Sequence, residues 1–476
     1  MIFAISSVTR YRAGLSQEHP FGYYLAALAH VKSTPLIGSP DAIQNSLLMG
    51  RFGMYQHIGT SLWDISQFCM RQCVELGYHA PPKIVQEPLH EQKQRRIFWE
   101  CYILDRYSSG ILGRPYAIAD DDISVELPVL ADDDALKAAN VASLSVISGA
   151  TPPFPTEVSV FVFYIRLRRI SSCIRTEFFN GRKLHSSSGH GTPMPFTSAG
   201  YVQVTVQNFL VELDAWRQSA PVFTTPKSLY ERPEFYDFLL EKDKLSLVRA
   251  AIHVAPKLRN NAPPSDLLAQ ALLSATRVIT LYSNMLANSY ITWTRSYFQG
   301  IFTAGLSILF CINTGPPTEP PPCPGTARPT DTLQLCSEIL HSFEKEMPDV
   351  RSFTAVFDEL KDAAIRKVQS HSDDNVADGH TSSEAIVAHR GIDAHQGTST
   401  SHMHTLVPNV TDHSSSTPME IDLNTQYFNP FPAEPAGLDW PIMTEEFIEN
   451  LEAGLGEYAW GFAGDDVYDW SLPDVS

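Results

Sequence analysis

The stretch Arg95–Pro128 reads RRIFWECYILDRYSSGILGRPYAIADDDISVELP and decides the class of the fold. Its first part, from Ile97 to Leu104, is apolar on nearly every side of a helix, and Glu100 is the one charged residue within it. A helix without a wide polar face is normally buried inside a larger protein. We therefore expect this helix to lie at the centre of a helical domain with an uncharged interior.

Charged residues stand on both sides of this apolar run. Arg95 and Arg96 precede it, and Asp105 and Arg106 follow it. Arg96 and Glu100 are four residues apart, so we expect them to form a weak pair along one edge of the helix.

The segment after the helix combines turn residues with charge. Gly113 and Pro115 should end the helix, because glycine accepts left-handed geometry and the residue before proline is pushed out of the helical region. Aspartates at positions 120–122 follow, within reach of Arg106 or Arg114. This cluster is either a catalytic or phosphate site, or a set of buried arginines paired with carboxylates and carbonyls. Buried charges are usually paired, which favours the second interpretation.

The quoted stretch is similar to the signature of the fungal transcription-factor regulatory domain, the helical middle homology region of binuclear zinc-cluster transcription factors. The segments ELGYH (75–79) and FTAGL (302–306), and the closing helices joined by Met347-Pro348 and continuing into RSFTAVFDELKDAAI (351–365), resemble the same domain in the same order. The resemblance implies an all-α regulatory domain over residues 36–367. Its signature positions here are Arg95, Arg96, Trp99, Asp105, Arg106, Gly113, Arg114, Pro115 and Asp122.

The charge of the chain is unevenly distributed. The 476 residues are 43% hydrophobic, enough for a sizeable core, and their formal charge is −18. Residues 391–476 contain fifteen Asp and Glu and neither Lys nor Arg. The body is therefore nearly neutral and the C-terminal part strongly acidic.

The cysteines and apolar runs indicate a soluble intracellular protein. Seven scattered cysteines without Cys-x-x-Cys are typical of reduced thiols. Cys69 and Cys73 share one helical face, and we interpret them as core residues rather than metal ligands. We find no signal peptide, and the run Ile301–Ile312 is too short to span a bilayer. We expect no membrane contact.

Helical periodicity recurs along most of the chain from Pro40 onward, and no segment shows the sustained alternation of a strand. Residues 1–35 have no clear period, and residues 129–156 read as a loop. We expect Ser265 to cap a helix. Gly300 and Gly305 should let a neighbouring helix approach closely.

A basic helix is expected around residues 163–175. Its arginines lie on the sides away from an apolar stripe. We interpret them as a solvated face rather than a nucleic-acid contact, because no aromatic or glycine-rich loop accompanies them. These arginines are Arg166, Arg168, Arg169 and Arg175.

The composition changes beyond residue 367. Residues 368–418 are polar and predict a disordered linker. Residues 419–476 contain thirteen acids, no bases and ten aromatics. Repulsion between the carboxylates should keep the rings available for a partner, although docking on the chain's own body remains an alternative. The activation residues we predict are Phe428, Phe431, Trp440, Phe447, Leu451, Trp460 and Trp470.

The resemblance implies a nuclear transcription regulator of a metabolic or secondary-metabolite gene set, with the coactivator machinery as partner. It allows a small-molecule effector and a homodimer. Family members bind DNA through six N-terminal cysteines, but the first cysteine here, Cys69, lies in an expected helix. We therefore expect DNA contact only through a missing or separate module, and zinc only if a cysteine cluster precedes this sequence.

Two other classes of protein remain as alternatives. One is an α-helical metabolic enzyme, although the sequence contains no GxSxG, HExxH, GxGxxG or GxxxxGK[ST] motif. The other is an α-helical binding scaffold unrelated to transcription. We assign no catalytic, cofactor-binding or metal-binding residue and expect a protein that is not an enzyme.

Overall fold

The fold is known from a computed structural model that describes residues 1–31, 38–139, 152–180, 199–257, 262–288, 293–314, 327–381 and 450–456. Regular structure in these ranges is helical, which confirms the predicted all-α class. The longer helices are α1 (Ile2–Arg12), α2 (Pro20–Val31), α3 (Pro40–Gly53), α4 (Leu62–Glu75), α5 (Pro88–Ile111), α6 (Asp133–Ala138), α8 (Ser159–Arg175), α10 (Ala199–Gln218), α11 (Pro233–Val254), α12 (Ser265–Ala287), α13 (Arg295–Thr314), α14 (Pro329–Glu344) and α15 (Arg351–Thr381).

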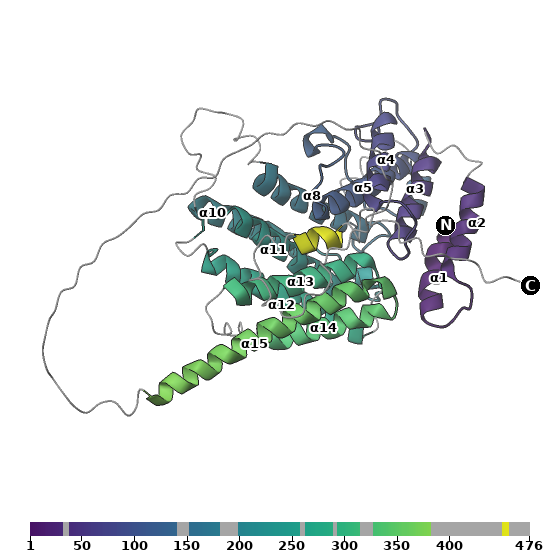
Figure 1. Cartoon of the computed structure of the whole chain (residues 1–476). Helices are drawn as coiled ribbons and strands as arrows, with labels where there is room; N and C mark the ends of the chain where they lie inside the picture. The colour runs from purple at the N-terminus through teal and green to yellow at the C-terminus, as the bar shows by residue number, and fades with distance from the viewer. Residues whose placement is uncertain are drawn as a thin grey trace, which may run out of the picture.

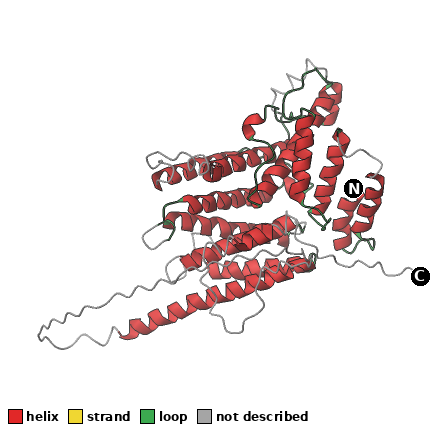
Figure 2. Cartoon of the chain, turned by 45° about the horizontal axis from the view of Figure 1, so that its top comes forward, coloured by secondary structure: helices red, strands yellow, loops and turns green. Residues whose placement is uncertain are grey.

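The helices surround two main apolar cores. The smaller core is built by α3, α4 and α5, and the larger by helices from α8 to α15 (Figure 1). Figure 2 shows the helices of the larger core stacked in layers that run in similar directions. Ile165 of α8 is fully buried in the smaller core, while Phe163 and Leu167 of the same helix belong to the larger one. Helix α8 therefore joins the two cores.

The N-terminal segment is helical, although residues 1–35 show no clear period. Helices α1 and α2 form a hairpin that packs on α3, where the rings of Tyr24 and Phe52 stack with centroids 4.7 Å apart. Arg12 then ties this hairpin to distant elements. Its Nη1 donates to the carbonyl of Trp293 at 2.5 Å, and its Nε lies 3.4 Å from a carboxylate oxygen of Glu346. Tertiary contacts therefore stabilise helices that local pattern does not predict.

Helix α4 has a capping residue at its start and a glycine at its end. The Ser61 side chain accepts a hydrogen bond from the Asp64 amide at its start. Gly77 adopts φ +76°, and the Tyr78 amide donates to the carbonyl of Cys73 at 2.8 Å. These are the features of a glycine-terminated helix end.

Cys69 and Cys73 are core residues, as predicted. Both are fully buried, and so is Cys101 of α5. The Sγ atoms of Cys73 and Cys101 are 3.6 Å apart. Burial raises the pKa of the Cys101 thiol, which is typical of an unreactive structural cysteine.

Three local predictions are wrong. Helix α6 lies within the expected loop 129–156. Ser265 begins α12, but Pro264 occupies the cap position and no side chain caps the helix. Helix α15 continues to Thr381, so the expected boundary at residue 368 falls inside a helix.

Helix α13 runs through the larger core. Among the described helices it is the one long and apolar enough to cross a membrane by length and composition, but 61% of the relevant window is buried inside the protein. Its two glycines differ. A Cβ on Gly305 would overlap the ring of Phe357 and lie 2.8 Å from Cys336 Sγ, whereas one on Gly300 would meet only Lys242 Cε at 3.7 Å. The prediction of close approach is confirmed for Gly305 and wrong for Gly300.

We expect the two glycines to respond in opposite directions to alanine. Gly305→Ala should destabilise the protein by about 1–3 kcal/mol, because α14 and α15 leave no room for a methyl group. Gly300→Ala should be neutral or stabilising by up to about 1 kcal/mol, since alanine favours helix. Urea unfolding monitored by circular dichroism measures both, and equal effects would contradict this account of the packing.

His341 of α14 provides a pH-dependent contact with α15. Its Nε2 lies 2.7 Å from Asp358, and its Nδ1 lies 2.9 Å from Glu344. Burial lowers the pKa of His341, but the hydrogen bonds to these carboxylates outweigh burial and raise it above 6.5.

The folded protein thus binds the His341 proton more tightly than the unfolded chain. This stabilisation is present below about pH 6.5 and is lost as pH rises through the raised folded-state pKa. As pH rises through that window, we expect the melting temperature of the unaltered protein to fall by more than the melting temperature of the His341→Gln variant. Parallel pH profiles of the two proteins would refute the assignment. The effect should be small because the side chain is 50% exposed.

Candidate functional site

The predicted arginine and aspartate cluster assembles around Arg106, near the end of α5. Its side chain is 1% exposed. Nη1 donates to Asp105 Oδ2 at 2.5 Å, Nη2 to the Ile118 carbonyl at 2.8 Å, and Nε to Ser172 Oγ of α8 at 3.1 Å. The guanidinium carbon lies 4.2 Å from the ring centroids of both Tyr102 and Tyr116. One cation therefore joins α5, the following loop and α8.

Asp105 receives hydrogen bonds from three parts of the chain besides Arg106. Its Oδ1 accepts from Gln67 Nε2 of α4 at 2.7 Å and from Ser109 Oγ at 3.2 Å. The backbone amide of Ala117 also points at this carboxylate, 3.2 Å from Oδ1. The carboxylate thus fixes α4 and the loop onto α5.

Asp120 closes the cluster from the loop side, in the short helix η1 (Asp120–Asp122). Its Oδ1 lies 3.2 Å from Arg106 Nη2 and accepts from the Tyr102 hydroxyl at 2.7 Å, while Ser172 donates to its Oδ2. The expectation that an aspartate of this triplet reaches Arg106 is confirmed for Asp120. Asp122, a predicted signature residue, is exposed instead.

The electrostatics of the cluster are those of a buried, mutually satisfied ion pair. Burial raises the pKa of Asp105, although Arg106 and the Ala117 amide oppose the shift. Burial lowers the pKa of Arg106, but the negative groups around it outweigh burial and leave that pKa raised. The guanidinium therefore stays charged, and its hydrogen bonds are directed at protein groups.

Arg95 and Arg96 of α5 bind side chains of the segment that follows η1. Arg95 Nη1 donates to Glu126 Oε2 at 3.0 Å, and the Trp99 indole donates to the Glu126 carbonyl at 2.9 Å. Arg96 pairs with Asp133 at 2.6 Å. The expected pair of Arg96 with Glu100 is wrong, because Glu100 bonds to Arg51 of α3. Tertiary partners replace the weak local pair.

The end of α5 is as predicted, and its contacts extend beyond the prediction. Gly113 has φ +65°, and the Arg114 amide donates to the Ser109 carbonyl at 3.0 Å. The Arg114 guanidinium lies 4.7 Å from the Trp63 ring centroid. Pro115, next in the chain, is exposed. Arg175 of α8 donates to the carbonyls of Gly110 and Arg114 at 2.7 and 3.1 Å.

The basic face of α8 is only partly solvated. Arg166 and Arg169 are exposed as expected, but Arg168 is 5% exposed and bonds to Asp243 of α11 at 2.6 Å. Together with the buried Arg106, this pair shows that the expectation of an uncharged interior is wrong. Sequence spacing identified no partner for Arg168 or Arg175, because the partner of Arg168 lies on α11 and those of Arg175 lie at the end of α5 and just after it.

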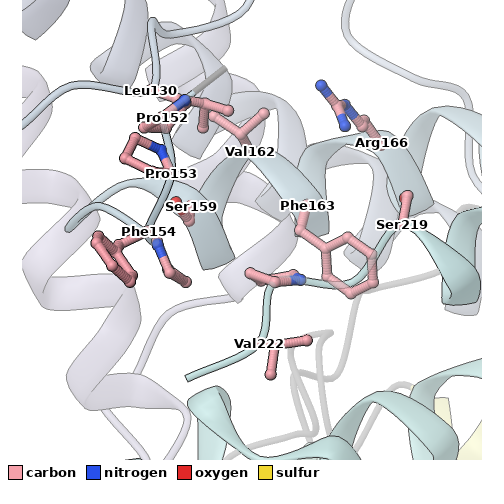
Figure 3. A pocket seen from close by; sticks show the side chains of 12 residues that line it. Leu130, Pro152, Pro153, Phe154, Ser159, Val162, Phe163, Arg166, Ser219 and Val222 are labelled. Carbon is pink, nitrogen blue, oxygen red and sulfur yellow. The ribbon is translucent and has the colours of Figure 1, made fainter. Parts of the chain in front are cut away.

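A separate pocket of about 400 Å³ lies between the start of α8 and the end of α10 (Figure 3). Phe163 and Val162 line it, and Arg166 stands at its edge. Phe154 and Val222 also line it and are 74% and 77% exposed, so the apolar wall is open to solvent.

Among the described residues, no three His, Cys, Asp or Glu side chains are placed to hold a metal ion.

The acidic C-terminal part contributes one described segment, the short helix of residues 450–456, drawn in yellow beside α11 and α13 in Figure 1. Leu451 is 7% exposed, Leu455 is fully buried, and both belong to the larger core. Leu451, predicted to be available to a partner, is therefore covered by the chain itself. The other six predicted activation residues lie outside the described residues.

A comparison with known protein families matches the part of the chain that contains this arrangement. The family model described as "Fungal specific transcription factor domain" matches residues 2–218, which include α1, α2 and the Arg106 cluster. The match begins before the boundary expected at residue 36 and ends with α10. No solved structure gives a significant match.

Curated relatives extend this likeness. A "Positive regulator of purine utilization" from Emericella nidulans is 22% identical over 375 residues, 64% of this chain and 34% of the relative. "Pyrimidine pathway regulatory protein 1" from Saccharomyces cerevisiae is 22% identical over 279 residues, 57% of this chain and 28% of the relative. A "Negative regulator of pleiotropic drug resistance" from Candida glabrata is 31% identical over 136 residues, 27% of this chain and 14% of the relative. The chain spans about a third or less of these relatives.

Removing one member of the buried pair should be costly. We expect Asp105→Ala to destabilise the protein by about 3–5 kcal/mol, because Arg106 would remain buried without its nearest counter-charge. Asp122→Ala, in the same loop but exposed, should change stability by less than about 0.5 kcal/mol. Denaturant unfolding compares the two variants, and a mild effect of Asp105→Ala would show that the pair does not hold the loop.

Proposed function

We propose that this chain, whose residues 2–218 match the model of the fungal specific transcription factor domain, is a nuclear regulator of transcription. The observation that carries the proposal is the match of this domain over the helices that assemble the Arg106 cluster. The relatives described above are named as regulators. Two of those names refer to purine and pyrimidine metabolism, which supports a set of metabolic genes as the target.

The proposed mode of action is binding rather than catalysis. The charged groups of the Arg106 cluster bond to one another and hold α4, α5 and α8 together, as a structural network does. The acidic, aromatic segment 419–476 supplies the surface for the coactivator machinery, with its rings as anchors. In this scheme the helical body positions the acidic segment.

DNA, effector and oligomeric state complete the proposal. DNA contact would come from a module other than this helical body, and zinc would belong to that module. The pocket between α8 and α10 is the candidate site for a small-molecule effector, since its volume falls in the range of ligand pockets. A homodimer is compatible with this scheme.

The activation segment can be tested directly. Residues 419–476 fused to an unrelated DNA-binding domain should switch on a reporter gene, because the carboxylates keep the rings accessible. Replacing Trp440, Phe447 and Trp460 by Ala should reduce reporter output by about tenfold, the loss expected when interface anchors are truncated. Immunoblotting controls for expression. A silent fusion, or one indifferent to the triple substitution, would contradict activation by this segment.

A further inference from the structure

The short helix of residues 450–456 is held to the body by both apolar and charged contacts. Leu451 and Leu455 are buried in the larger core. Gly456 is so close to the end of α5 that a Cβ there would lie 3.4 Å from Ile111 Cγ2. The contact thus joins the acidic segment to the α5 end that the Arg106 cluster fixes in place.

Glu452 provides the charged contact. Its Oε2 pairs with Arg249 Nη2 of α11, and Arg249 Nη1 donates to Ser307 Oγ of α13 at 3.2 Å. The side chains of Arg249 and Glu452 are 26% and 19% exposed, so the pair is largely shielded from water. An acidic residue between two leucines therefore meets an arginine held between two helices of the body.

The second carboxylate oxygen of Glu452, Oε1, is buried and has no hydrogen-bond partner among the described residues. A buried carboxylate oxygen without a partner weakens a contact, because it has given up its water. Such a contact is suited to release when another protein offers a better site for the same leucines.

We propose that residues 450–456 act as a latch when they dock on the surface formed by α11, α13 and the end of α5. Arg249 holds the latch closed by pairing with Glu452, and the closed latch withholds Leu451 and Leu455 from a coactivator. The occupant of this surface is the chain's own acidic helix. The inference rests on the proposed function, because it assigns a regulation to the activation segment. Docking and coactivator binding exclude each other, because leucines buried against the body cannot also enter the groove of another protein.

The test uses the full chain, fused to an unrelated DNA-binding domain, with variants on the body side that leave the acidic segment intact. Arg249→Glu should open the latch and raise reporter output by about fivefold or more, the lower range of typical coupling between two sites. Adding Glu452→Arg restores an opposite-charge pair and should return output toward that of the unaltered chain. Rescue by the charge swap separates a lost latch from a misfolded body.

Lys244→Glu is the matched control. Lys244 lies on the same helix α11 and pairs with Asp214 at 2.7 Å instead of with the latch helix. The same charge reversal at this position should leave reporter output unchanged. An increase equal to that of Arg249→Glu would overturn the assignment of Arg249 as the latch residue.

Hydrogen–deuterium exchange provides a readout independent of transcription. The amides of residues 450–456 should be protected in the unaltered full chain, lose protection in Arg249→Glu and regain it in the charge swap. Rapid exchange in the unaltered chain would refute the latch. If the isolated segment 419–476 activates the reporter, but Arg249→Glu releases the helix without raising the reporter output of the full chain, the regulation is refuted and the proposed function still stands. A silent isolated segment would refute the proposed function, on which the regulation rests.

Discussion

Arg106 brings a charge into the contact between α5 and α8, and the surrounding structure is arranged to accommodate it. A buried cation is costly unless nearby groups replace the water it has lost. Asp105, Asp120, Ser172 and the Ile118 carbonyl together do so. Because these groups come from different segments, satisfying one guanidinium fixes α5, α8 and the intervening loop relative to one another.

The acidic helix and the α5 end meet on this fixed framework. Gly113 and the carbonyl bonds of Arg175 hold the last turn of α5, and Gly456 approaches Ile111 in that same turn. The Arg106 cluster therefore helps to position the surface on which the acidic segment docks. The same helix end thus takes part both in the Arg106 network and in the surface on which residues 450–456 dock.

The interior of this protein contains more charged groups than its amino-acid composition suggests. The buried pairs Arg106–Asp105 and Arg168–Asp243 lie at contacts between helices rather than at the surface. Hydrophobic contacts alone would tolerate sliding of one helix along another, whereas a hydrogen-bonded guanidinium accepts one register. The pairs thus supply orientation where the two apolar cores meet.

The amino-acid sequence by itself determined the all-α class, the burial of α5 and the turn at Gly113, because helical periodicity, capping and glycine geometry are local properties. The contact of Arg106 with an aspartate of 120–122 was also predictable, since the two lie close along the chain. Only the tertiary structure decided that Arg96 meets Asp133, that Arg168 is buried, and that Leu451 docks on the body. Those partners are distant in sequence, and which of several carboxylates an arginine meets depends on how the helices pack.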